Sequence, residues 1–241
     1  MSTTLETAML MAAGLGKRMR PLTATRPKPL IRVAGQPLMD HALDRIEDAG
    51  IRRTVVNVHY LAGPIEAHLE SRARRTGASY PVSDERARLL ETGGGLVKAL
   101  PLLGDKPFLC ANSDNLWING PFDSIRALAD RWDDDAMDAL LLLVPHARAT
   151  GHRGLGDFHM EANGRLSRRK PGRVAPFVFT GVQILSPRLV RDPPGEVFST
   201  NIFWDRAIEQ GRAFGLSHGG HWFDVGTPQA IPLVEAGLAD G

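Results

Sequence analysis

Short apolar runs alternate with amphipathic segments of helical period through the first 145 residues of the chain. The apolar runs predict strands at 8–12, 54–58, 79–82, 107–111 and 138–144. The segments between them predict helices at 37–49, 61–72, 94–103 and 121–131. Because strands that alternate with helices are typical of strand–helix–strand units, this half predicts a largely parallel sheet covered by helices.

The pattern changes after Pro145. Asn163-Gly164 is a strong signal for a hairpin turn, and the short runs on either side of it predict a small β-ribbon. Beyond the ribbon we expect, in chain order, a strand, a helix, a strand and a closing helix, at 174–185, 199–210, 213–217 and 228–237. No internal repeat or long linker divides the chain. We therefore predict one α/β domain over residues 1–241, with a Rossmann-like, mixed but mostly parallel sheet.

Composition narrows the class of protein. Hydrophobic residues make up 43% and charged residues 23%, which is typical of globular proteins. A net charge of +2, and aromatic residues that do not interleave with the basic clusters, argue against nucleic-acid binding. The single cysteine, Cys110, excludes an internal disulfide, and we expect it to be a core residue. Without a recognisable signal peptide or a bilayer-long apolar run, the sequence predicts a cytoplasmic protein with no membrane partner.

The first predicted strand leads into a glycine loop that is rich in cations. Gly14 and Gly16 leave the backbone N–H groups open to a phosphate, while Lys17, Arg18 and Lys28 supply positive charge. Ligands of open parallel sheets bind at the carboxyl ends of the strands, where this loop begins. These features predict a polyphosphate site.

Two better-known glycine loops do not fit. A dinucleotide-binding loop would have a small residue where Met19 stands and would open a helix at once, but prolines at 21, 27 and 29 keep the segment irregular. A P-loop would place Ser or Thr after its lysine to hold magnesium, and here Arg18 follows Lys17.

The loop instead resembles the signature of the sugar-1-phosphate nucleotidyltransferases. Its elements stand here as Ala12-Ala13-Gly14-Leu15-Gly16-Lys17-Arg18, Pro21-Leu22-Thr23 and Pro27-Lys28. The resemblance implies a fold of the nucleotide-diphospho-sugar transferase type. It also implies an enzyme that transfers a nucleoside monophosphate from a nucleoside triphosphate to a sugar 1-phosphate and releases pyrophosphate.

The resemblance assigns roles to individual residues. Arg18 and Lys28 would be catalytic, Arg18 at the triphosphate and departing pyrophosphate, Lys28 at the α-phosphate or the attacking phosphate. The family's nucleobase loop is matched by the glycine-rich stretch 90–96, although a flexible turn is an alternative reading of such a run. The nucleotide-binding residues would be Ala12, Ala13, Gly14, Gly16, Lys17, Glu91, Thr92, Gly93, Gly94 and Asn112.

Two aspartates are candidate ligands for Mg²⁺, which binds oxygen and is held in proteins by one or two carboxylates together with water and substrate phosphates. Asp114 follows an apolar run, in a segment that resembles the family's Asn-Gly-Asp with Ser113 in place of glycine. Asp224 begins Asp224-Val225-Gly226-Thr227, which resembles the family's Asp-x-Gly-Thr. An aspartate after a strand can also cap a helix or form a turn.

On the sugar side the resemblance suggests Asp157, Gly181 and Asn201. Within the family the chain most resembles the short bacterial N-acetylmuramate-1-phosphate uridylyltransferases of cell-wall recycling, through 15–23, 90–95 and Gly156-Asp157-Phe158. That implies UTP and N-acetylmuramate 1-phosphate as small-molecule substrates, and a monomer or small homo-oligomer. Mannose-1-phosphate guanylyltransferase, glucose-1-phosphate uridylyl- or thymidylyltransferase, and a non-catalytic regulatory protein that binds nucleotide sugars remain alternatives.

Overall fold

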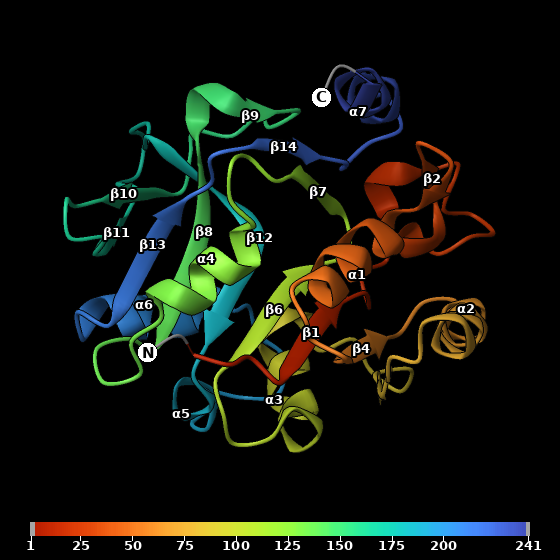
Figure 1. Ribbon diagram of the computed structural model, residues 1–241, viewed down its shortest axis with the longest axis horizontal. Coiled ribbons are helices and arrows are strands. Elements are labelled where there is room, and N and C mark those ends of the chain that lie inside the picture. The colour runs from red at the N-terminus through yellow and green to blue at the C-terminus, as the bar shows by residue number, and fades with distance from the viewer. Residues whose placement is uncertain (1–2, 240–241) are drawn as a thin grey trace.

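A mixed central sheet runs through the computed structural model, which describes residues 3–239 (Figure 1). Strands β6, β1, β4 and β5 are mutually parallel, whereas β12 runs antiparallel to both β6 and β8, and β13 is parallel to β8. In the described residues the sheet consists of β1 (Thr7–Met11), β4 (Arg53–Val58), β5 (Val82–Asp84), β6 (Phe108–Asn112), β8 (Ala139–Pro145), β10 (Phe158–Met160), β11 (Leu166–Arg168), β12 (Phe177–Leu185) and β13 (Ala213–Ser217).

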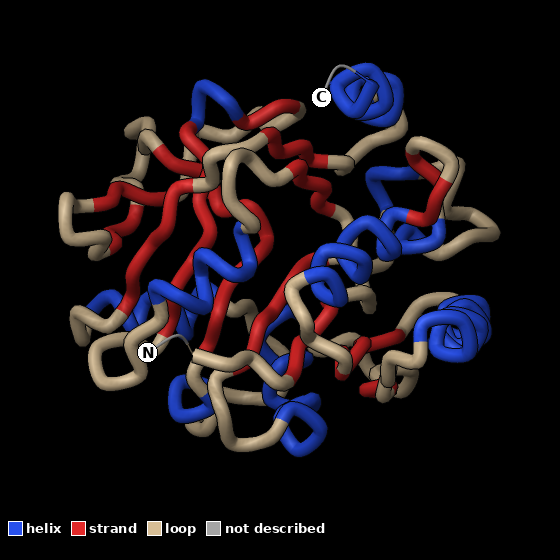
Figure 2. The backbone as a smooth tube through the Cα atoms, viewed as in Figure 1, coloured by secondary structure: helices blue, strands red, loops and turns tan. Residues whose placement is uncertain are grey.

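Helices cover both faces of the sheet, and Figure 2 shows the strands in the middle of the molecule with the helices around them. Because side chains alternate along a strand, Ala8 and Leu10 of β1 pack with α1, α2 and α4, while Met9 packs with α3, α5 and α6. None of the described helices has the length and apolar character needed to cross a membrane. The helices are α1 (Leu38–Asp48), α2 (Ala62–Thr76), α3 (Glu91–Leu103), α4 (Ser124–Arg131), α5 (Pro187–Val190), α6 (Asn201–Glu209) and α7 (Ala230–Ala239).

The expected architecture is confirmed: a mixed sheet, parallel in its first half and flanked by helices, with β10 and β11 as the small ribbon. Cys110 is a core residue of β6, and burial raises the pKa of its thiol to about 12, so the sulfur stays protonated. Several boundaries differ from the expectation. The predicted strand at 79–82 lies at Val82–Asp84, and α2 continues to Thr76 because Gly77, with a φ of 71°, provides its left-handed C-cap.

Two small sheets were not expected from the sequence. In one, β14 (His221–Asp224) lies between β7 (Asn115–Ile118) and β9 (Ala149–Thr150). In the other, β2 (Arg32–Val33) pairs with β3 (Gln36–Pro37). These strands are short and their partners are often distant in sequence, so the local pattern of apolar and polar residues does not predict them. The first sheet matters for function because it brings the end of β14 beside the turn that follows β6.

Candidate active site

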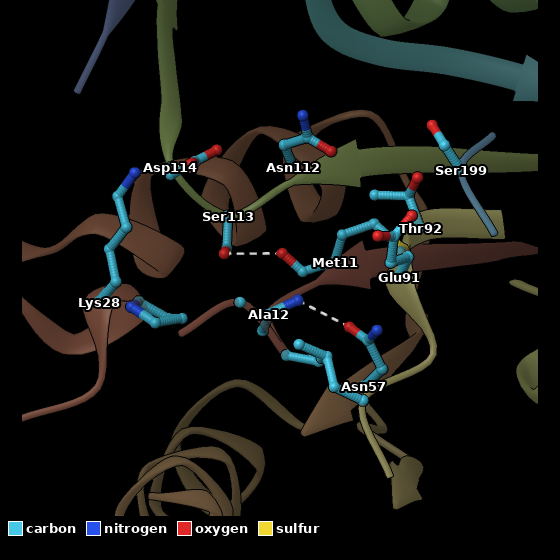
Figure 3. A pocket seen from close by; sticks show the side chains of 14 residues that line it. Met11, Ala12, Lys28, Asn57, Glu91, Thr92, Asn112, Ser113, Asp114 and Ser199 are labelled. Atoms are coloured by element: carbon cyan, nitrogen blue, oxygen red, sulfur yellow. Dashed lines mark hydrogen bonds and ion pairs between the residues drawn. The ribbon is translucent and has the colours of Figure 1, made fainter. Parts of the chain in front are cut away.

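The carboxyl ends of β1 and β6 meet at one edge of the sheet. The two strands are parallel, with Met11 opposite Asn112. The backbone N–H and the hydroxyl of Ser113 both donate to the Met11 carbonyl, at 3.2 and 2.7 Å. These bonds tie the turn that carries Asp114 to the start of the glycine loop (Figure 3). The sheet therefore brings together two segments that the sequence analysis assigned to one site.

A first cavity of about 380 Å³ opens at this edge. Figure 3 shows Lys28 and Asp114 on one side of it, and Glu91, Thr92 and Ser199 on the other. Eight of the predicted site residues line this cavity: Ala12, Ala13, Gly14, Lys28, Glu91, Thr92, Asn112 and Asp114. The remaining lining residues were not predicted: Met11, Pro29, Asn57, Leu89, Ser113 and Ser199.

The two loop glycines have different roles. A Cβ on Gly14 would have no neighbour within 4 Å, and this residue lines the cavity, so its backbone is open to a ligand. Gly16 has a φ of +59°, and a Cβ there would lie 2.9 Å from Thr23 Cγ2 and 3.0 Å from Lys28 Cβ. Gly16 therefore lets the loop pack against the Pro-Lys segment, and it lines none of the described cavities. Lys17 is exposed and also lies outside them.

Lys28 and the two aspartates form the charged part of the site. Lys28 Nζ donates to Asp114 Oδ2 at 2.6 Å, and its side chain is only 10% exposed. Asp224 ends β14, where it pairs with Asn115, the residue after Asp114. Burial raises the pKa of the Asp224 carboxyl, and the charge of Asp114 raises it further. The two carboxylates thus repel each other across a partly buried space.

This donor set fits Mg²⁺. Burial and the charge of Asp114 together raise the Asp224 pKa, and a divalent cation held by the two carboxylates would offset both effects. Residues 3–239 contain no cluster of three or more His, Cys, Asp or Glu side chains placed to hold a metal. Water and phosphate oxygens would supply the other ligands, which is the usual arrangement for Mg²⁺. Arg18 lies near Asp224, since a Cβ on Gly226 would be 2.9 Å from Arg18 Nη1 and 3.1 Å from Asp224 Oδ1.

A second cavity, of about 250 Å³, adjoins the first and shares Asn112 and Asp114 with it. Arg18 and Asp224 also line it, as do two of the predicted sugar-side residues, Asp157 and Asn201. The backbone N–H of Phe179 donates to Asp157 Oδ2 at 2.9 Å, which holds that carboxylate in place.

Gly181, the third predicted sugar-side residue, does not line this second cavity. It has a φ of +87°, and a Cβ there would lie 2.4 Å from Asn115 Oδ1 and 3.0 Å from Asn112 Nδ2. Gly181 therefore makes room for the two asparagines.

The three glycines lie in the first turns of α3, which begins at Glu91 and so three residues before the expected start at Gly94. The nucleotide-binding role of Gly93 and Gly94 stays a prediction. The N–H groups of Gly93 and Gly94 both donate to the Phe198 carbonyl, at 2.8 and 3.2 Å, and so are not directed to a ligand. A Cβ on Gly93 would lie 2.4 Å from Phe198 Cε2, and one on Gly94 would lie 2.1 Å from the Glu196 carbonyl oxygen. Because glycine has no Cβ, the segment that contains Glu196 and Phe198, before α6, can pack directly against the first turns of α3.

Gly94→Ala is expected to destabilise the protein by about 2 kcal/mol, the cost of overpacking against a backbone atom. The matched control is Gly63→Ala in α2, where a Cβ would meet nothing within 4 Å. This control is expected to change the free energy of unfolding by less than about 0.5 kcal/mol, because the smaller loss of conformational freedom of alanine is offset by crowding against the following Pro64. Urea unfolding of both variants checks the difference. Equal effects would contradict a steric role for Gly94.

Two buried polar residues of the site were missed from the sequence. Asn57 on β4 accepts from the Ala12 N–H at 2.7 Å and donates to Glu85 Oε1 at 2.7 Å. Glu85 Oε2 accepts from the Leu90 N–H at 3.1 Å. This chain of bonds links the glycine loop to the start of α3. The available signal was an asparagine inside the apolar run 54–58, since a buried amide needs partners.

Comparison with known proteins identifies the family of the chain. Residues 7–240 match the family described as Nucleotidyl transferase. The chain is 44% identical to N-acetylmuramate alpha-1-phosphate uridylyltransferase of Caulobacter vibrioides, over 97% of both chains. It is 36% identical to the protein of the same name from Neisseria meningitidis serogroup B, over 95% of this chain and 96% of the other.

The fold also matches a solved structure. A putative glucose-1-phosphate thymidylyltransferase from Bacillus anthracis superposes with a TM-score of 0.81, covering 98% of this chain and 96% of the other at 16% identity. At that identity the likeness concerns the fold alone, which is the nucleotide-diphospho-sugar transferase fold that the motifs implied. The chain belongs to the nucleotidyl transferase family and is an enzyme of the class that transfers a nucleotide to a sugar 1-phosphate.

Proposed function

We propose that this enzyme transfers UMP from UTP to N-acetylmuramate 1-phosphate, forming UDP-N-acetylmuramate and pyrophosphate, in the recycling of cell-wall sugars. The observation that carries the proposal is the pair of adjoining cavities that share Asn112 and Asp114, with Arg18, Lys28 and Asp224 around the junction. The choice of nucleotide and sugar is supported by the names of the two relatives described above, which align along almost the whole chain.

In this proposal the first cavity holds the nucleotide and the second holds the sugar phosphate. The backbone at Ala12–Gly14 would lie against the triphosphate, with Lys28 at the α-phosphate. Arg18 would reach the departing pyrophosphate from the side of the second cavity, which it lines. An oxygen of the sugar phosphate attacks the α-phosphorus while the bond to pyrophosphate breaks, so no covalent intermediate with the enzyme is needed. The chain contributes alignment of the two substrates and positive charge around the reacting phosphorus.

We further propose Mg²⁺ as the cofactor, held by Asp114 and Asp224. When bound, the ion supplies positive charge to the phosphate oxygens. Lys28 would keep the Asp114 carboxylate oriented through their 2.6 Å ion pair. The proposal also includes a cytoplasmic enzyme of one domain over residues 1–241, a monomer or small homo-oligomer, that acts on small molecules and not on nucleic acid.

A substrate panel tests the proposal. Magnesium-dependent pyrophosphate release is measured for UTP, dTTP, GTP and CTP against the 1-phosphates of N-acetylmuramate, N-acetylglucosamine, glucose and mannose. The highest kcat/KM is expected for UTP with N-acetylmuramate 1-phosphate. A higher value for GTP with mannose 1-phosphate, or for glucose 1-phosphate with UTP or dTTP, would show one of the alternative activities. If no pair reacts, a binding protein without turnover is the better description.

A further inference from the structure

The second cavity contains a cation that the reaction at the phosphates does not use. Arg168 lines it from β11, in the β-ribbon. Arg18, the other arginine there, lies beside Asp224 and Gly226. In Figure 1, β11 and α6 lie on the left, away from β7 and β14, which flank the reacting centre. The ribbon that carries Arg168 therefore lies away from β14, which carries Asp224.

The Arg168 guanidinium is held in a defined position. Its Nε donates to Asp205 Oδ1 at 2.6 Å, and its Nη2 donates to the carbonyl and side-chain oxygens of Asn201 at 3.0 and 3.1 Å. Its central carbon lies 5.0 Å from the centre of the Phe158 ring and 5.2 Å from that of the Trp204 ring. Such a preorganised group loses little further side-chain entropy when it binds a ligand.

Part of the guanidinium remains available to a ligand. The side chain is 30% exposed, and no residue within 3–239 accepts a hydrogen bond from Nη1. Asp205 is engaged through Nε and is itself 52% exposed, so its negative charge is partly screened by solvent. The N–H groups of Nη1 can donate charge-assisted hydrogen bonds to a carboxylate. The cavity therefore offers a site for a second anionic group on its ligand.

We propose that Arg168 binds the lactyl carboxylate of N-acetylmuramate 1-phosphate and so selects this sugar acid over neutral sugar 1-phosphates. This inference rests on the proposed function. The acceptor carries two anionic groups, and its phosphate belongs with Lys28 and the aspartates at the reacting centre. A carboxylate that enters a cavity without a partner costs free energy, so a second cation is required for it. Glucose, mannose and N-acetylglucosamine 1-phosphates carry no such group.

The test combines a substitution of Arg168 with a change in the lactyl group of the substrate. The kcat/KM for N-acetylmuramate 1-phosphate is compared with that for the analogue whose lactyl acid is an amide. Wild type is expected to prefer the acid by roughly 30-fold, the lower range for removing one partner of a charge pair. Arg168→Gln is expected to use acid and amide about equally, and Arg168→Lys to keep part of the preference. Arg165→Gln, in the same ribbon but outside the cavity, should retain the wild-type ratio.

The outcomes separate the inference from the function on which it rests. If wild type reacts with the acid and Arg168→Gln keeps the same preference over the amide, the inference is overturned and the proposed function stands. If Arg168→Gln slows both substrates equally, or if its melting temperature falls and the ratio does not change, Arg168 acts only through the fold and the inference is again overturned. If wild type uses neither substrate but activates another sugar, the function and the inference fail together.

Discussion

Asp114→Asn is expected to slow pyrophosphate release by about 1,000-fold, the range for removing a group that stabilises charge at the reacting centre. Asp114 is the residue on which the charged groups converge: it accepts from Lys28 at 2.6 Å, its charge raises the pKa of Asp224, and it lines both cavities. Asparagine keeps the size of the side chain and removes its charge. Steady-state kinetics with a pyrophosphate assay measure the effect.

The control for this variant is Asp130→Asn, near the exposed end of α4, where activity should stay within twofold of wild type, as is usual for surface changes. A far-ultraviolet circular dichroism spectrum and a melting temperature establish that Asp114→Asn is folded. Turnover of a folded Asp114→Asn enzyme within tenfold of wild type would refute the role of this carboxylate.

Arg18→Ala is expected to lower kcat by about 300-fold, whereas Lys17→Ala is expected to lower it by less than about threefold. The two residues are adjacent in the glycine loop, and both were predicted to bind the nucleotide. Both side chains are exposed, but Arg18 lines the second cavity and lies near Asp224, while Lys17 lines none of the described cavities. A group that neutralises the charge of departing pyrophosphate acts on kcat, so the comparison is made at saturating substrate.

Equal losses in Arg18→Ala and Lys17→Ala would contradict this division of roles. The result would then mean that the glycine loop rearranges when nucleotide binds, so that Lys17 also reaches the phosphates. A fluorescence titration with nucleotide in the absence of the sugar phosphate would separate weaker binding from slower transfer in either variant.

The elements that the sequence predicted well depend on local patterns. β1, β4, β6 and β8 are apolar runs whose residues are buried on both faces of the sheet, and the helices between them carry one apolar stripe each. Gly14 and Lys28 also follow from local chemistry, since a bare backbone and a cation are what a phosphate needs. The other six predicted residues that line the first cavity were assigned through the family resemblance.

The predictions that failed or were missing concern contacts between distant segments. Gly93 and Gly94 are helical because Phe198 accepts their N–H bonds and the backbone at Glu196 needs the space above them. Nothing within 90–96 indicates that neighbour, so the helix was expected to begin at Gly94 and the residues before it to form a loop. β7 and β14 were absent from the expectation for the same reason, because each short strand is stabilised by its partner.

The sequence by itself determined the apolar periods that build the sheet and the glycine loop with its cations, and it indicated the family and the reaction type. The tertiary structure decided which of these groups meet. It placed Asp224 beside Asp114 through the pairing of β14 with β7, separated Arg18 from Lys17, and directed Arg168 into the second cavity. The physical reason is that propensity and charge are properties of a short segment, whereas burial, repulsion between carboxylates and the shape of a cavity arise only when remote segments pack together.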